Sequence, residues 1–274
     1  MYGAILGDII GSPYEFGGGK KTKDFPLFIK ESTYTDDTVM TIAVADALME
    51  SMGGTDEEIC SALVRSMKKW GRRFPDAGYG TAFWKWLKKM HPKPYGSYGN
   101  GSAMRVSPAG WLYKTLEETR HAAVLTAEVT HNHSEGIRGA EAVASAIYLA
   151  RTGSGKDEIR DYITREFGYN LSRTCDEIRP EYRYFPDCAH TVPEAVTAFL
   201  EGTDFEDAVR NAVSLGGDCD TLTCITGSMA EAFWGVPAPL KEECRKRLAY
   251  SMTFVAERFD YYLEHGTDLY GLEN

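Results

Sequence analysis

The stretch Thr35-Asp36-Asp37-Thr38-Val39-Met40-Thr41-Ile42-Ala43-Val44-Ala45-Asp46-Ala47-Leu48-Met49 joins an acidic start to a run that is apolar on nearly every side. A helix on the protein surface would carry polar residues along one face, and residues 38–49 offer almost none. We therefore expect these residues to form a helix that is buried at the centre of the protein and begins at the two aspartates.

A second stretch, Gly216-Gly217-Asp218-Cys219-Asp220-Thr221, has the same character. It also places two carboxylates and a threonine hydroxyl directly before an apolar run that is typical of a buried helix. Asp and Thr are preferred helix N-caps, so capping alone explains either stretch taken singly. One cap needs only one side-chain oxygen, however, and carboxylates this close repel one another unless a cation lies between them. The repetition favours a site for Mg²⁺, Mn²⁺ or Ca²⁺ over Zn²⁺, which prefers His or Cys.

The overall composition excludes several classes of protein. The chain has 274 residues, of which 43% are hydrophobic, enough for a sizeable core, and no linker divides it, so we expect one domain over residues 1–274. A net charge of −10 argues against general nucleic-acid binding, and no apolar stretch is long enough to span a membrane. The 6 cysteines are scattered, with no C-x-x-C pair and no secretory leader, which predicts reduced thiols and a cytoplasmic location.

The remaining pattern is helical, with no convincing alternating strand, so we expect an all-α fold of about eleven helices. Predicted helices include one over residues 1–10, one with a capping box at Thr55-Asp56-Glu57-Glu58, and single helices over residues 103–113 and 240–263. Residues 168–190 show no clear period and are expected to form a long irregular excursion.

Other segments offer candidate ligand contacts. The loop Gly99-Asn100-Gly101-Ser102 can converge backbone N–H groups at a helix N-terminus and so bind phosphate, although an ordinary glycine-rich turn explains it equally well. His131, after Thr130, suits either a ligand contact or a structural hydrogen bond. The basic, glycine-rich residues 17–21 are either a lid or an exposed loop.

In these features the chain resembles the ADP-ribosylglycohydrolase family, which includes the ADP-ribosylarginine hydrolases and the dinitrogenase reductase-activating glycohydrolase. The resemblance extends from Gly3 to Trp234, with the motifs in the family's order. They are Glu15, Thr35-Asp36-Asp37, Gly99-Asn100-Gly101-Ser102, Thr130-His131 and Gly216-Gly217-Asp218-Cys219-Asp220-Thr221. The resemblance implies an orthogonal multi-helix bundle that holds two divalent cations, Mg²⁺ or Mn²⁺.

The resemblance also implies a role for each matching residue. The implied metal ligands are Thr35, Asp36, Asp37, Asp218, Asp220 and Thr221, with Glu15 as a mobile acidic ligand beside them. The implied catalytic residues are Glu15, Asp36, Asp37 and Asp218, and the implied substrate contacts are Gly99, Asn100, Gly101, Ser102 and His131. Cys219 departs from the family, which commonly has Thr at that position. A side chain between two ligands at alternate positions points away from them, so the ligand set is unaffected.

The implied reaction is hydrolysis of the glycosidic bond between ADP-ribose and an acceptor, with an ADP-ribosylated protein side chain, arginine favoured, as substrate. Glu15, Asp36 or Asp37 is the candidate base, while Glu15 and Asp76 are candidates for the proton donor. Two alternatives stay open: a two-metal phosphohydrolase that acts on a nucleotide-like substrate, and a non-catalytic ADP-ribose-binding protein. The sequence does not indicate an oligomeric state.

Overall fold

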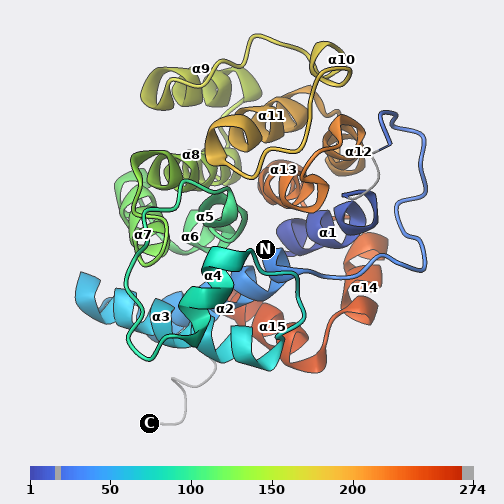
Figure 1. Cartoon of the computed structure of the whole chain (residues 1–274). Coiled ribbons are helices and arrows are strands. Elements are labelled where there is room, and N and C mark those ends of the chain that lie inside the picture. Colours follow the sequence, from blue (N-terminus) through green and yellow to red (C-terminus); the bar gives the residue numbers. More distant parts are fainter. Residues whose placement is uncertain (16–19, 267–274) are drawn as a thin grey trace.

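The computed structural model describes residues 1–15 and 20–266, and every regular element within them is a helix (Figure 1). This confirms the predicted all-α class. The extended segments of this described part form only one isolated bridge, between Gly99 and Asp187. The described part contains 15 α-helices and one 3-10 helix, more than expected, because two predicted helices are each divided in two and the helices Leu116–Glu128 and Cys175–Ile178 were not predicted.

The first half of the chain forms α1 (Tyr2–Gly11), a 3-10 helix (Ser12–Tyr14), α2 (Asp36–Glu50), α3 (Asp56–Arg73), α4 (Thr81–Lys88), α5 (Gly101–Met104), α6 (Ser107–Leu112) and α7 (Leu116–Glu128). The second half forms α8 (Ser134–Arg151), α9 (Lys156–Phe167), α10 (Cys175–Ile178), α11 (Cys188–Glu201), α12 (Phe205–Leu215), α13 (Cys219–Trp234), α14 (Ala238–Arg247) and α15 (Tyr250–His265). None of the helices in these described ranges is both long and apolar enough to cross a membrane.

Two predicted single helices were wrong. The helix expected over residues 103–113 is divided between α5 and α6, and Pro108 lies in the first turn of α6, where its fixed φ and missing N–H suit a helix start better than a helix interior. The helix expected over residues 240–263 is divided between α14 and α15, because Leu248 and Ala249 have extended ψ angles of 147° and 143°. The capping box at Thr55 is confirmed.

Helices α1 and α13 lie side by side at the centre of the molecule (Figure 1). Their contact face is made by glycines four residues apart on α1, at positions 3, 7 and 11. A Cβ atom at Gly7 would lie 2.1 Å from the carbonyl oxygen of Thr223, and one at Gly3 would lie 2.2 Å from that of Gly227. The two backbones therefore touch directly, which fixes the carboxyl end of α1 beside the start of α13.

Helix α2 is buried from Asp37 to Met49, which confirms the predicted central helix. It contacts α1, α3 and α15. Its one charged residue within the apolar run, Asp46, is satisfied from two other helices. The carboxylate accepts hydrogen bonds from Trp70 Nε1 and Lys69 Nζ, both at 3.0 Å, and pairs with Arg258 NH1 at 2.9 Å. Asp46 thus connects α2 to α3 and α15.

We expect Asp46→Ala to lower the free energy of unfolding by about 3 kcal/mol, because it leaves the buried Arg258 without the carboxylate that it pairs with. Chemical denaturation measures the change. Glu50→Gln is the control, since it removes only the exposed pair with Arg65 and should cost less than about 1 kcal/mol. Equal effects of the two substitutions would contradict the connecting role of Asp46.

Candidate active site

A cavity of about 550 Å³ lies where the starts of α2 and α13 face the loop before α5. It collects residues from segments that are far apart in the sequence. The predicted site residues along its wall are Glu15, Thr35, Asp36, Asp37, Gly99, Asn100, Gly101, His131, Asp218, Asp220 and Thr221. The structure therefore brings together eleven of the twelve predicted site residues, and Ser102 is the one that does not line the cavity.

The start of α13 is shaped by two glycines in the left-handed region. Gly216 and Gly217 have φ angles of 74° and 76°, which L side chains rarely adopt, and a Cβ atom at Gly217 would lie 2.6 Å from the carbonyl oxygen of Arg183. This turn delivers Asp218 to the N-cap position of α13, where its side chain makes no capping hydrogen bond. The carboxylates of Asp218 and Asp220 both line the cavity instead.

At the start of α2, capping accounts for Thr35 but not for the two aspartates that follow it. Thr35 Oγ1 accepts a hydrogen bond from the backbone N–H of Asp37 at 3.3 Å, and it also lies 3.4 Å from Asp220 Oδ2. Thr221 Oγ1 donates to Asp37 Oδ2 at 3.2 Å. The two helix starts are therefore in contact, each through a threonine of one and an aspartate of the other.

Sequence reasoning missed Asp8, the acid that interrupts the apolar pattern of α1. Its side chain is fully buried and accepts hydrogen bonds from the backbone N–H and hydroxyl groups of both Thr35 and Thr38, at distances of 2.5 to 3.0 Å. Asp8 thus holds the first turn of α2 beneath the carboxylate cluster. The signal was available: an acid within an otherwise apolar helix must find partners in the core.

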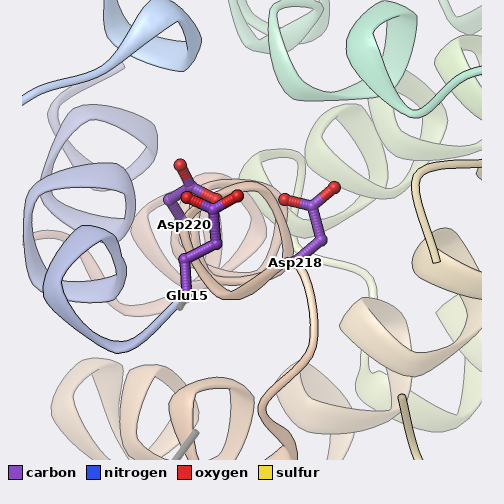
Figure 2. A group of neighbouring side chains, drawn as sticks. All are labelled: Glu15, Asp218 and Asp220. Carbon is purple, nitrogen blue, oxygen red and sulfur yellow. The ribbon is translucent and has the colours of Figure 1, made fainter. Parts of the chain in front are cut away.

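Three carboxylates come closest to one another. Glu15, Asp218 and Asp220 each offer an oxygen, and these oxygens all lie within 4.8 Å of one another. Figure 2 shows the three carboxyl groups turned toward the same side, with Glu15 coming from the segment after α1 and the two aspartates from the start of α13. Asp36 and Asp37 line the same cavity from α2. This arrangement provides hard oxygen donors from three segments of the chain.

Burial raises the pKa of every acid in this group, and repulsion between the carboxylates adds to the effect for all of them except Asp220. Desolvation, followed by the charge of Asp220, raises the pKa of Asp8 to about 7 and that of Glu15 to about 8. The same two causes hold the pKa of the carboxyls of Asp36, Asp37 and Asp218 well above their usual range. Without a bound cation, it is therefore energetically unfavourable for all of these carboxyl groups to be ionised together.

These residues fit a divalent metal centre. No ion pair within the described residues involves any of the six acids Asp8, Glu15, Asp36, Asp37, Asp218 and Asp220. Asp37 Oδ1 is buried and has no hydrogen-bond partner within this part of the chain. A buried carboxylate oxygen without a donor is rare, and a divalent cation is a partner that suits its chemistry.

The opposite wall of the cavity is the loop before α5. The side-chain amide of Asn100 donates to Asp218 Oδ2 at 2.7 Å and to Thr191 Oγ1 at 3.1 Å, so it ties this wall to the acidic one. The His131 ring lies against the loop, with Nε2 3.2 Å from the position that a Cβ atom of Gly101 would occupy. Glycine at position 101 therefore leaves one edge of the imidazole open.

Some predictions for individual residues are not supported by their placement. The Ser102 hydroxyl donates to the carbonyl oxygen of Gly136 at 2.7 Å and does not line the cavity. The Cys219 thiol lies 3.8 Å from the carbonyl oxygen of Val213 and does not line the cavity. All six cysteines are free thiols, which agrees with the sequence-based expectation. The glycines of the candidate lid, residues 17–19, lie outside the described residues.

Asp76 and Tyr184 are among the other residues that line the cavity. Asp76 is a candidate proton donor, and Tyr184 comes from the segment between α10 and α11. The irregular excursion expected over residues 168–190 was wrong in part, because α10 lies within it and α11 begins at Cys188. Tyr184 is 53% exposed, and no motif singled it out. A tyrosine in a segment without periodicity gives no signal of its own.

The sequence profile described as ADP-ribosylglycohydrolase matches residues 1–271. The chain belongs to this family. The family is one of glycosidic-bond hydrolases, and membership agrees with the resemblance carried by the two acidic motifs.

Relatives in the ADP-ribosylglycohydrolase family support the assignment. Human ADP-ribosylhydrolase ARH3 is 27% identical over 324 aligned positions, covering 89% of this chain and 87% of the relative. ADP-ribosylarginine hydrolase Tri1 of Pseudomonas putida (strain GB-1) is also 27% identical, covering 92% of this chain and 73% of the relative. A solved ADP-ribosylglycohydrolase-related protein complex superposes with a TM-score of 0.66 at 23% identity, covering 94% of this chain and 95% of the other. That likeness shows the fold.

Proposed function

We propose that this protein hydrolyses the glycosidic bond between ADP-ribose and an acceptor, and that the acceptor is the arginine side chain of a protein. The observation that carries the proposal is the meeting of two chemically different walls in one cavity. One wall supplies clustered carboxylates, and the other supplies a glycine-rich loop with a histidine. A dinucleotide-sized ligand such as ADP-ribose needs both, since it joins a reactive ribose to a diphosphate.

Two divalent cations, Mg²⁺ or Mn²⁺, fit the acidic wall. In the proposed site they are held by Thr35, Asp36, Asp37, Asp218, Asp220 and Thr221, with Glu15 as a further acidic ligand. When bound, such cations neutralise the acids, bind sugar hydroxyls and lower the pKa of water. The orphaned Asp37 oxygen and the contact between Thr221 and Asp37 support this ligand set.

The residues of the chain itself carry the remaining steps. In the proposed binding mode the distal ribose lies at the acids and the diphosphate of ADP-ribose contacts Gly99, Asn100 and Gly101, which line the same cavity. Glu15 lies beside Asp218 and Asp220, and its carboxyl makes no hydrogen bond within the described residues. When it does not bind a cation, its ionised carboxylate can take a proton from the attacking water and pass it to the leaving group. Asp36 and Asp37 are alternative bases, and Asp76 is an alternative proton donor.

The acceptor preference is supported by charge. Glu31 and Asp76 line the cavity in addition to the metal-binding acids. A guanidinium group is cationic, so acidic side chains around the leaving group favour arginine over serine. One of the relatives, Tri1, is named for its action on ADP-ribosylarginine. A partner of this protein would accordingly be an ADP-ribosylated protein.

The test is a substrate panel assayed with Mg²⁺ and, separately, with Mn²⁺. We expect release of ADP-ribose from an ADP-ribosylarginine peptide, with slower release from an ADP-ribosylserine peptide. A nucleotide phosphomonoester should stay intact. Release of phosphate from the phosphomonoester would instead favour a two-metal phosphohydrolase. Tight ADP-ribose binding without cleavage of any peptide would favour a non-catalytic ADP-ribose-binding protein.

We also expect the metal centre to stabilise the fold. Adding Mg²⁺ to protein treated with a chelator should raise the melting temperature by about 5 °C or more. Saturation at a hundred times Kd adds about 2.7 kcal/mol to the free energy of unfolding, and each kcal/mol raises the melting temperature of a protein of this size by about 2 to 4 °C. Differential scanning fluorimetry measures the shift. Na⁺ at the same ionic strength is the control, and an equal shift with Na⁺ would show general screening in place of a metal site.

A further inference from the structure

Arg105 is a buried cation at the edge of the cavity. It is 1% exposed, lines the cavity and lies over the Phe83 ring, 5.8 Å from its centroid. No carboxylate pairs with it within the described residues. Burial lowers its pKa to about 10, so the guanidinium still carries its charge at neutral pH. Its role must therefore be sought in the neutral groups that it contacts.

Those contacts lead to His131 in two steps. Arg105 NH2 donates to Thr130 Oγ1 at 2.7 Å and to the carbonyl oxygen of Thr126 at 2.9 Å. Thr130 Oγ1 in turn lies 2.6 Å from His131 Nδ1. The direction of this last hydrogen bond decides which ring nitrogen of His131 carries the proton.

The hydrogen of the Thr130 hydroxyl has two possible acceptors. One is the carbonyl oxygen of Ala127, at 3.5 Å, and the other is His131 Nδ1, at 2.6 Å. The Ala127 oxygen already receives the backbone N–H groups of Thr130 and His131, at 3.0 and 2.7 Å. Two such bonds occupy both lone pairs of a carbonyl oxygen. The hydroxyl therefore donates to Nδ1, and the bond that it accepts from Arg105 strengthens this donation.

We propose that Arg105 and Thr130 are positioning residues that hold His131 in the tautomer with its proton on Nε2, ready to donate a hydrogen bond to an oxygen of the bound ligand. If the ligand is ADP-ribose, as the proposed function requires, the acceptor is a phosphate oxygen held by residues Gly99 to Gly101. Nε2 faces this loop and makes no hydrogen bond within the described residues.

The charge state of His131 agrees with this role. Burial, and then the charge of Arg105, hold the pKa of the imidazole well below its usual range. The ring is accordingly neutral at pH 7 and has a single N–H group. A neutral ring with its proton on Nδ1 would present the lone pair of Nε2 to the ligand and repel an anionic oxygen. The arrangement thus lets Arg105 act on the ligand through Thr130 and His131.

The tautomer can be read directly from two-bond ¹H–¹⁵N spectra of ligand-free protein labelled with ¹⁵N-histidine. We expect His131 to show an unprotonated Nδ1 in the wild type. Thr130→Val keeps the shape of the side chain but removes the hydroxyl, and it should move His131 toward protonated Nδ1. Thr130→Ser, the conservative variant, should restore the wild-type pattern. His131→Ala assigns the signals by their absence.

The ligand half of the proposal is tested by calorimetric titration with ADP-ribose. Thr130→Val should raise Kd by about 10-fold, His131→Ala by at least as much, and the double variant no more than His131→Ala alone. A protonated Nδ1 in the wild type, or an unchanged tautomer in Thr130→Val, would overturn the proposal. Additive losses in the double variant would overturn the route through His131. Failure of the wild type to bind ADP-ribose would contradict the proposed function. It would not affect the tautomer result, which is measured on ligand-free protein.

Discussion

Replacing Asp218 or Asp36 by asparagine is expected to reduce turnover by at least about 10³-fold, equivalent to about 4 kcal/mol of barrier, while the protein remains folded. Both carboxylates line the cavity, and neither is part of an ion pair that holds helices together within the described residues. Asparagine keeps the size of the side chain but binds a divalent cation far more weakly than a carboxylate does. Initial rates with an ADP-ribosylarginine peptide and Mg²⁺ measure the loss.

The same variants separate a metal centre from a structural cluster. Without metal, an asparagine relieves the repulsion that raises the pKa of these acids, so we expect the melting temperature in chelator to equal or exceed that of the wild type. The stabilisation by added Mg²⁺ should be lost. Asp157→Asn, which changes an exposed acid far from the cavity, should retain both wild-type turnover and stabilisation. Normal turnover in an Asp36→Asn, Asp218→Asn double variant would refute metal-assisted hydrolysis.

The acidic walls of the site were predictable because each lies within a few consecutive residues. Thr35-Asp36-Asp37 and Asp218-Cys219-Asp220-Thr221 carry more oxygens than a cap needs, and the apolar runs behind them indicated buried helices. In the structure Thr35 caps α2, and Asp220 accepts the backbone N–H of Thr221 in the first turn of α13. The carboxylates beyond those that a cap needs belong to Asp36, Asp37, Asp218 and Asp220, and all four residues line the cavity.

What could not be predicted depends on contacts between distant segments. Asp8 reaches Thr35 and Thr38 because α1 and α2 lie together, and local sequence contains no measure of that distance. The path from Arg105 to His131 likewise joins residues 26 positions apart, through a hydroxyl whose donor direction depends on a carbonyl of α7. Ser102 shows the converse: it was expected in a loop that contacts the ligand, but it lies in the first turn of α5 and its hydroxyl is buried against the carbonyl oxygen of Gly136.

Substituting Gly7 by alanine is expected to lower the free energy of unfolding by about 4 kcal/mol, more than a typical overpacked core position. The added Cβ would lie 2.1 Å from the carbonyl oxygen and 2.4 Å from the carbonyl carbon of Thr223, and 2.7 Å from the Cα of Cys224. All three neighbours are backbone atoms of α13, so no side chain can rotate away. Relief requires the separation of two whole helices.

That separation would also reach the active site, because α1 carries Asp8 and leads to Glu15 while α13 begins beside Asp218. We therefore expect any folded Gly7→Ala protein to have lost the Mg²⁺-dependent rise in melting temperature, even though position 7 does not line the cavity. Gly155→Ala is the matched control: the added Cβ would have only Glu158 Oε2 near it, at 3.8 Å, and loss of a glycine N-cap should cost about 1 kcal/mol or less. Wild-type stability and Mg²⁺ response in Gly7→Ala would show that the contact between α1 and α13 does not set the geometry of the site.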